Sequence, residues 1–148
     1  MQTSDTPSTG GEMPAGYQRH TRRSPLTDPW EPLFAREAGE AVQLALVVRD
    51  AHCNSRGFAH GGLISSLADN AMGLSVGHVA RAQLGNDKAS AVTVALALDF
   101  IDSAKVGECL EFHPQVLKVG RTLAFVDCRV VCGERLVARA NASFRLLG

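Results

Sequence analysis

Apolar residues recur at intervals of three and four positions between residues 63 and 79, which is the spacing of a buried helical face. The opposite face of this predicted helix carries mostly Gly and Ser, together with one charged residue, Asp69. Each glycine within a helix costs about 1 kcal/mol relative to alanine. We therefore predict that another segment approaches this face closely, and that Asp69 is a candidate functional carboxylate.

Strand patterns flank this helix on both sides. Residues 41–50 form one candidate strand, and residues 90–101, 107–119, 121–132 and 135–147 form four more, separated by glycines at turns. Bulky side chains occupy every second position from Val92 to Phe100, with small or polar ones such as Thr93 and Asp99 between them. We expect the bulky face to pack against the protein and the other face to admit a close neighbour. The order of elements predicts an α+β architecture, with an antiparallel sheet wrapped around one helix.

The N-terminal region has a different composition. Residues 1–25 are rich in Ser, Thr, Gly and Pro without periodicity, which predicts a mobile tail ahead of a single domain over residues 26–148. A short helix is expected next, with Asp28 as its cap, Pro29 in its first position and Glu31 completing a capping box. Its face of Trp30, Leu33 and Phe34 would pack as a lid or plug.

Composition and charge narrow the function classes. The chain has 148 residues, with 15 basic and 15 acidic ones, so no net field favours nucleic acid or an anionic membrane as a partner. The sequence shows no signal peptide and no membrane span. Its four cysteines form no CxxC pair and are expected to be reduced. These features favour a cytoplasmic protein with a small-molecule or protein partner.

The segment "HGGLISSLADNAMG", residues 60–73, resembles the HGG-x-x-x-x-LAD signature of hotdog-fold acyl-CoA thioesterases. The similar branch includes the phenylacetate-pathway enzymes, one type of 4-hydroxybenzoyl-CoA thioesterase and mammalian thioesterase-superfamily proteins. "VTVALALDFIDSAKVGE" and "VLKVGRTLAFVDCRV" are similar to later segments of the family, and the resemblance runs from about residue 41 to the C-terminus. It implies a hotdog fold, an acyl-CoA substrate, no cofactor, and a homodimer, with two such dimers commonly associating into a homotetramer.

The resemblance assigns the reaction to two positions. Asp69 matches the catalytic carboxylate, which either attacks the thioester carbon or takes a proton from an attacking water; the sequence leaves both roles open. Gly61 matches the position at the helix start whose backbone N–H polarises the thioester carbonyl and holds the oxyanion. In the family these two residues come from opposite subunits.

Further roles follow from the same resemblance. Asn54 matches a polar residue that orients the water or the thioester, and Thr93 matches a hydroxyl that binds the water, although an ordinary strand residue is an equal alternative. His60 is either a substrate contact or a helix-entry residue bonded to the backbone. The resemblance also implies substrate-binding residues at the helix start and at a predicted hairpin turn, where relatives bind the pantetheine and nucleotide of coenzyme A: Gly62, Lys118, Gly120 and Arg121.

Other chemistries lack their motifs. Cys53, His52 and His60 are close in sequence but do not form a zinc set, so no metal is expected. Ser65 and Ser66 lack the G-x-S-x-G context of a serine nucleophile, and no glycine-rich phosphate loop is present. Two alternatives to a thioesterase stay open: a non-catalytic acyl-CoA-binding hotdog module and a hotdog hydratase or dehydratase. Intact Asp69 argues against the first, and the motifs of the second are absent.

Overall fold

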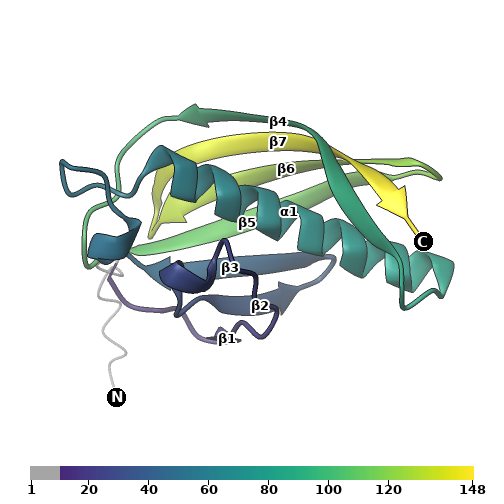
Figure 1. Ribbon diagram of the computed structural model, residues 1–148, viewed down its shortest axis with the longest axis horizontal. Coiled ribbons are helices and arrows are strands. Elements are labelled where there is room, and N and C mark those ends of the chain that lie inside the picture. The colour runs from purple at the N-terminus through teal and green to yellow at the C-terminus, as the bar shows by residue number, and fades with distance from the viewer. Residues whose placement is uncertain (1–10) are drawn as a thin grey trace, which may run out of the picture.

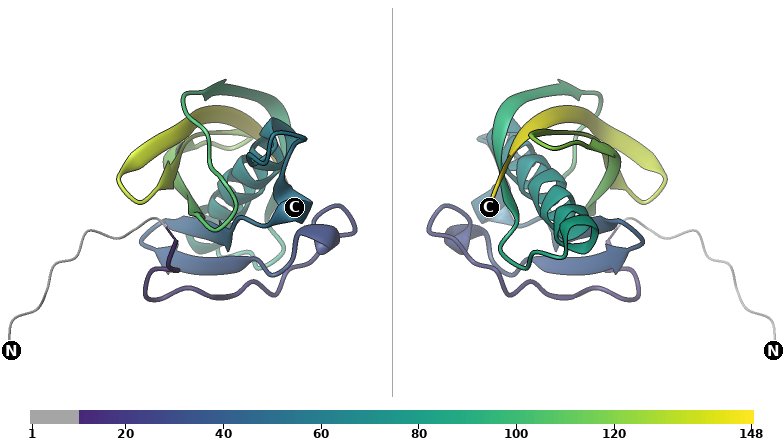
Figure 2. Two further views of the ribbon diagram at one scale, coloured as in Figure 1. Left: turned by 90° about the vertical axis from the view of Figure 1, so that its left-hand side faces the viewer. Right: turned by 90° about the vertical axis from the view of Figure 1, so that its right-hand side faces the viewer.

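The structure is a computed structural model that describes residues 11–148. A single long helix, α1 (Gly61–Leu84), lies lengthwise in the hollow of one curved sheet (Figures 1 and 2). The sheet has the order β1-β2-β3-β5-β6-β7-β4, and every neighbouring pair is antiparallel. Its strands are β1 (Gln18–Arg19), β2 (Phe34–Ala38), β3 (Ala41–Val47), β4 (Ser90–Phe100), β5 (Cys109–Val119), β6 (Leu123–Cys132) and β7 (Arg135–Leu147). This arrangement confirms the α+β sheet-around-helix prediction.

Helix α1 buries the face that its sequence pattern predicts. The eight residues of that face are all nearly inaccessible to solvent: Leu63, Ile64, Leu67, Ala68, Ala71, Met72, Val76 and Val79. All of them except Val79 belong to one core cluster with sheet residues that include Phe112, which has no exposed surface, and Phe144. The helix ends at Gly85, whose φ of 61° is the left-handed conformation that glycine adopts readily.

The small residues on the other face of α1 have neighbours in the same chain. A Cβ atom added to Gly73 would lie 3.3 Å from the ring of Phe144, and one added to Gly61 would lie 3.3 Å from the ring of Phe100. At Gly77 the added atom would lie 2.9 Å from the guanidinium of Arg81. Close approach is thus confirmed, and part of it comes from β4, β7 and α1 itself.

Ser75 ties α1 to β3 through a buried hydroxyl. Its Oγ donates to the carbonyl of Ala71 at 2.8 Å and accepts from the backbone N–H of Val42 at 2.9 Å. Ser75 has no exposed surface. The hydroxyl therefore satisfies a β3 donor that has moved out of contact with water.

Strand β4 differs from the expected alternation because it contains a β-bulge. Its register with β7 shifts between Thr93 and Ala95, so that Thr93 pairs with Phe144 while Ala95 pairs with Ser143. The extra residue reverses the alternation. Thr93 therefore faces α1 together with Leu96, whereas Val92 lies on the outer face with Arg145. The prediction of one continuous bulky face that packs against the protein is wrong, and Val92, Val94 and Phe100 are each about half exposed.

The region before β3 also differs from its prediction. Asp28–Trp30 is one turn of 3-10 helix (η1) with Thr27 as its N-cap residue and no side-chain cap, and Phe34 begins β2. The Glu31 carboxylate accepts from the N–H of Leu33 at 2.6 Å, so the predicted capping box does not form. A second 3-10 turn, η2 (Asp50–His52), precedes α1. Arg49 donates to the carbonyls of Pro29 and Glu31, which anchors the η1 region to the body of the protein.

Part of the predicted tail is folded. Gln18 and Arg19 pair with Ala35 and Phe34 as strand β1, and the N–H of His20 donates to the carbonyl of Leu33 at 2.9 Å. The structure therefore differs from the prediction of an unstructured segment up to residue 25. Residues 1–10 of that prediction lie outside the described residues. No helix within residues 11–148 has the length and apolar character needed to cross a membrane.

Replacing Ser75 tests the link between α1 and β3. In Ser75→Ala the Val42 N–H loses its buried acceptor, so we expect the free energy of unfolding to fall by about 1–3 kcal/mol, measured by urea denaturation. Ser66→Ala is the matched control, because the Ser66 hydroxyl donates only to the Gly62 carbonyl one turn earlier. Equal losses in the two variants would contradict this role of Ser75.

Candidate functional site

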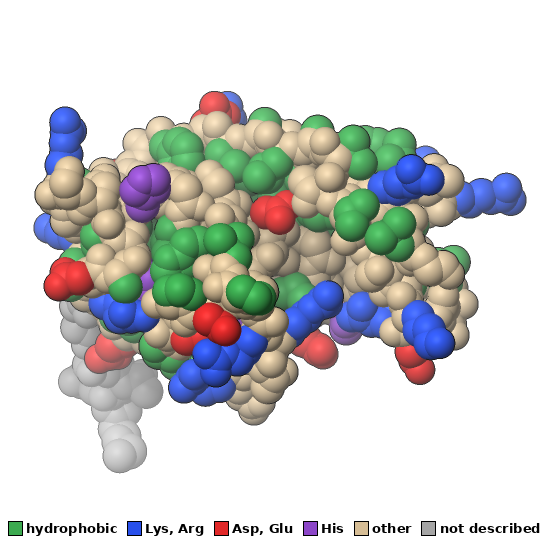
Figure 3. Space-filling model, in the orientation of Figure 1, with side chains coloured by type: hydrophobic (Ala, Val, Ile, Leu, Met, Phe, Trp, Pro, Cys, Tyr) green, Lys and Arg blue, Asp and Glu red, His purple; other side chains and the backbone are tan. Residues whose placement is uncertain are grey.

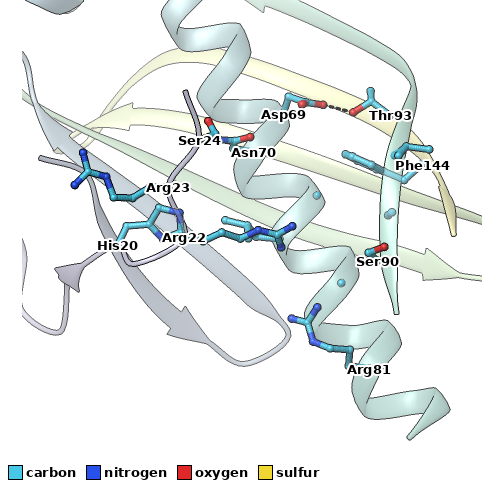
Figure 4. A pocket seen from close by; sticks show the side chains of 15 residues that line it. His20, Arg22, Arg23, Ser24, Asp69, Asn70, Arg81, Ser90, Thr93 and Phe144 are labelled. Atoms are coloured by element: carbon cyan, nitrogen blue, oxygen red, sulfur yellow. Dashed lines mark hydrogen bonds between the residues drawn. The ribbon is translucent and has the colours of Figure 1, made fainter. Parts of the chain in front are cut away.

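Asp69 and Thr93 meet across the gap between α1 and β4. The Thr93 hydroxyl donates to Asp69 Oδ1 at 2.5 Å, which is in the range of strong hydrogen bonds to a carboxylate (Figure 4). The bulge in β4 turns Thr93 toward the helix, and α1 presents Asp69 on the face that carries Gly73 and Gly77. Of the residues predicted to function with Asp69, Thr93 is the one whose side chain the structure places on the carboxylate.

A cavity of about 380 Å³ opens beside this pair (Figure 4). One wall is the face of α1 that carries Gly73 and Gly77, here called the small-residue face. Another wall is the first part of β4, from Ser90 to Thr93. The third wall comes from residues 20–24, which belong to the segment predicted to be a tail. Polar and charged side chains from this segment and from α1 line the cavity: His20, Arg22, Arg23, Ser24, Asn70 and Arg81.

Gly61 is the first residue of α1, and its N–H donates to no acceptor among residues 11–148. A free N–H at the positive end of a helix can stabilise a developing oxyanion. At about 1.5 Å of rise per residue, however, Gly61 lies about 12 Å from Asp69 along the helix axis. The two residues of one chain are therefore too far apart to act on the same carbonyl group.

His60 and Gly62 bind each other at the start of α1. His60 is the N-cap residue, and its Nδ1 accepts from the N–H of Gly62 at 2.8 Å. This bond supports the alternative that His60 is a helix-entry residue, and it occupies the N–H of Gly62. The side chain of His60 lies at the surface. Neither His60 nor Gly62 lines the cavity beside Asp69.

Asn54 organises the loop before α1. Its side-chain oxygen accepts from the N–H groups of Arg56 and Phe58, at 2.9 and 3.2 Å. These bonds form the side-chain-stabilised turn that Asn favours. The structure does not bring Asn54 to the cavity that holds Asp69 within the same chain.

Three of the predicted substrate-binding residues, Lys118, Gly120 and Arg121, lie at the end of β5 and in the turn that leads to β6. Lys118 and Arg121 are exposed, and the N–H of Gly120 closes the turn by donating to Leu123 at 2.8 Å. None of the three lines the cavity beside Asp69. The structure therefore separates this turn from the Asp69 and Thr93 pair.

Sequence reasoning missed the positively charged part of the cavity. Arg81 lies one helical turn after Gly77, and its charge at this position could have indicated that it lines the cavity. Arg22 and His20 were missed because the composition of residues 1–25 predicted a mobile tail. Burial lowers the pKa of His20 below its usual value, although Glu31 opposes this effect. His20 is therefore mainly neutral at pH 7, and the positive charge comes from the arginines.

Other reactive side chains do not form a site in the part of the chain that is described. Within residues 11–148, no group of three or more His, Cys, Asp or Glu side chains could hold a metal ion. Burial raises the pKa of Cys128 and of Cys132 to about 12, which keeps both thiols protonated at neutral pH. Ser65 donates to the carbonyl of Gly61 and Ser66 to that of Gly62, as hydroxyls within helices commonly do.

Comparison with known proteins gives consistent matches. Residues 56–139 match the family model described as "Thioesterase superfamily". The chain is 43% identical over 135 residues to the Pseudomonas aeruginosa protein named "Putative esterase PA0474", which covers 90% of this chain and 97% of that protein. It is 35% identical over 96 residues to human acyl-coenzyme A thioesterase 13, over 64% of each chain.

A solved structure agrees in fold. The crystal structure of smu.793 from Streptococcus mutans, described as bound to acetyl CoA, superposes with a TM-score of 0.64 at 29% identity, over 74% of this chain and 82% of that one. The arrangement of one helix within a curved antiparallel sheet is the hotdog fold of such thioesterases. The family match, which spans more than half of the sequence and includes Asp69 and Thr93, shows that this chain belongs to the thioesterase superfamily of thioester hydrolases.

Proposed function

We propose that the protein hydrolyses acyl-CoA thioesters, with Asp69 as its catalytic carboxylate and the Gly61 N–H as its oxyanion donor. The observation that carries the proposal is the hydrogen bond from Thr93 to Asp69 at the edge of a cavity. The acetyl CoA bound to smu.793 and the activity named for human acyl-coenzyme A thioesterase 13 support the substrate class.

Thr93 fixes how Asp69 meets the substrate. Its hydroxyl occupies Oδ1, so Oδ2 is the oxygen available for chemistry. As a base, Oδ2 takes a proton from water while the water oxygen bonds to the thioester carbon. The carbonyl oxygen becomes an oxyanion held by the Gly61 N–H, and the carbon–sulfur bond then breaks to release the thiolate, which is protonated. As a nucleophile, Oδ2 bonds to the carbon itself, the carbon–sulfur bond breaks to release the thiolate, and water then cleaves the resulting anhydride into the free acid and the Asp69 carboxylate.

Two subunits are needed to complete this site. Asp69 and Gly61 of one chain are about 12 Å apart along α1, so a second copy must supply one of them. Strand β4 is the edge of the sheet and has a free side on which another strand can pair. Apolar side chains gather along this part of the surface, and Val94, Phe100 and Ile101 are each more than half exposed (Figure 3). The proposed assembly is a homodimer joined at β4, with pairs of dimers forming tetramers.

The remaining predicted residues are assigned either to positioning the start of α1 or to binding coenzyme A. In the dimer, Asn54 and His60 stand on the loop that positions Gly61, and Gly62 continues the same helix start. Lys118 and Arg121 are exposed on either side of Gly120, so this hairpin carries two positive charges. We assign this turn to the phosphates or the pantetheine arm of coenzyme A.

Replacing Asp69 tests the chemistry. Asp69→Asn keeps the size of the side chain and removes its charge, so kcat/KM for acyl-CoA hydrolysis is expected to fall by about 10²–10⁴-fold, measured by thiol release. Circular dichroism checks that the variant is folded. A folded Asp69→Asn protein with near-normal turnover would refute the assignment.

Thr93 is a positioning residue, and two variants separate its hydroxyl from its shape. Thr93→Val keeps the branched shape but loses the donor to Asp69, and we expect about tenfold lower kcat. Thr93→Ser keeps the hydroxyl and should retain most of the activity. If the serine variant were as impaired as the valine variant, the β-branched shape and not the hydrogen bond would be what matters.

Mixing two inactive proteins tests the shared site. One carries Asp69→Ala and the other carries Gly61→Leu, which blocks the oxyanion position. In a mixed dimer of the proposed kind, one site receives both changes and the other receives neither, so co-expression should restore up to about half of the wild-type rate per mixed dimer. Verified mixed dimers without any recovery would show that both residues act from one chain.

A further inference from the structure

The cavity beside Asp69 continues along α1 to a positively charged region. Arg22 points from the N-terminal segment toward α1, and Arg81 lies along α1 on the side of the cavity away from Asp69 (Figure 4). Gly73 and Gly77 lie between Asp69 and Arg81 on the helix and also line the cavity. On the helix side, the part of the cavity between the carboxylate and the arginines is bordered by these two glycines, together with Asn70 and Leu74.

Arg81 is held within this cavity rather than extended into solvent. Its Nη1 donates to the carbonyl of Ala89 at 3.2 Å. A Cβ atom at Gly77 would lie only 2.9 Å from the same nitrogen. The guanidinium therefore folds back by one turn of the helix, toward Asp69, into the space that Gly77 leaves because it has no side chain.

The charges of Arg22 and Arg81 are not neutralised by neighbours. Arg23, which also lines the cavity, pairs with Asp28 at 3.0 Å and with Glu31 at 4.0 Å. The ion pairs formed within residues 11–148 include neither Arg22 nor Arg81. Two unpaired guanidinium groups facing one cavity provide a site for an anion, because guanidinium donors match a carboxylate or phosphate well.

We propose that the acyl group of the preferred substrate ends in a carboxylate, which binds Arg81 and Arg22 while its thioester lies at Asp69. This inference rests on the proposed function and names the substrate class of the same site. Asp69 repels the distal carboxylate and the arginines attract it, so the two ends of the acyl group are distinguished by charge.

The spacing suggests the length of the acyl group. Gly77, against which the guanidinium lies, is about 12 Å from Asp69 along the helix axis. A contact of about 3 Å to the thioester carbon at one end, and about 3–4 Å from the guanidinium to the distal carboxylate carbon at the other, leave about 5–6 Å between the two carbons. Each carbon–carbon bond of about 1.5 Å advances a zigzag chain by about 1.25 Å, so about four or five bonds span this gap. A dicarboxylate of about five or six carbons, such as adipate, has this spacing.

The phosphates of coenzyme A are the other anionic source within an acyl-CoA. The pantetheine arm lies between the phosphates and the thioester, and it contains many more bonds than are needed to span the gap between Asp69 and Arg81. The hairpin turn with Lys118 and Arg121 is available for them. The acyl carboxylate is therefore the better match to Arg81.

The test compares adipyl-CoA with hexanoyl-CoA, which share a six-carbon chain and differ in a terminal carboxylate or methyl group. We expect the wild-type protein to prefer adipyl-CoA by about tenfold or more in kcat/KM, since hydrogen bonds to charged groups contribute that much discrimination. Arg81→Gln should reduce the preference ratio by about tenfold. Arg145→Gln should leave the ratio unchanged, because Arg145 lies opposite Val92 on the outer face of the sheet.

The outcomes separate this inference from the proposed function. Hydrolysis of both thioesters without a preference for adipyl-CoA would overturn the inference and leave a thioesterase. Equal losses on both substrates in Arg81→Gln would assign the arginine to the phosphates and also overturn it. Hydrolysis of neither would refute the proposed function. In that case, calorimetry with the thioethers S-(5-carboxypentyl)-CoA and S-hexyl-CoA still tests whether the cavity binds the distal carboxylate. Equal affinities for the two thioethers would contradict the inference.

Discussion

The hydrogen bond between Thr93 and Asp69 is the contact on which the rest of the site depends. It forms because a bulge in β4 reverses the alternation of side chains and turns Thr93 toward α1. A regular strand would place either Thr93 or Leu96 on the wrong face of the sheet. The bulge thus allows Leu98 to pack against the core while Thr93 donates a hydrogen bond to the carboxylate. β-bulges are common beside active sites for this reason.

Three side chains pack closely against glycines of α1 that lack side chains of their own. Phe144 occupies the space over Gly73, Phe100 that over Gly61, and the Arg81 guanidinium that over Gly77. The glycine cost in helix stability is offset by the burial of the opposite face, whose residues are almost completely enclosed. The small-residue face borders the cavity, so one choice of residues gives both tight packing and an open space beside Asp69.

The sequence predicted the helix, its buried face and the later strands, because each of these has a regular hydrophobic period. Asp69 and Thr93 were also named from the sequence, although the bulge that unites them was not, since a single extra residue leaves no periodic signal. Residues 18–24 were read as a tail because their fold depends on partners distant in sequence, such as the pairing of Arg19 with Phe34. Arg22 and the cavity wall were missed for the same reason. Asn54 was predicted to orient the water or the thioester, and His60 to be either a substrate contact or a helix-entry residue; in the structure the hydrogen bonds of both side chains are local.

The central claim is that one active site combines Asp69 of one subunit with the Gly61 N–H of another. The most direct measurement is a crystal structure of the protein with the non-hydrolysable thioether S-hexyl-CoA bound. The account predicts that the sulfur and its neighbouring carbon lie between the Asp69 carboxylate of one subunit and the Gly61 N–H of its partner, with Thr93 still bonded to Asp69. A ligand whose sulfur lies away from Asp69, or contacts Asp69 and Gly61 of the same chain, would contradict it.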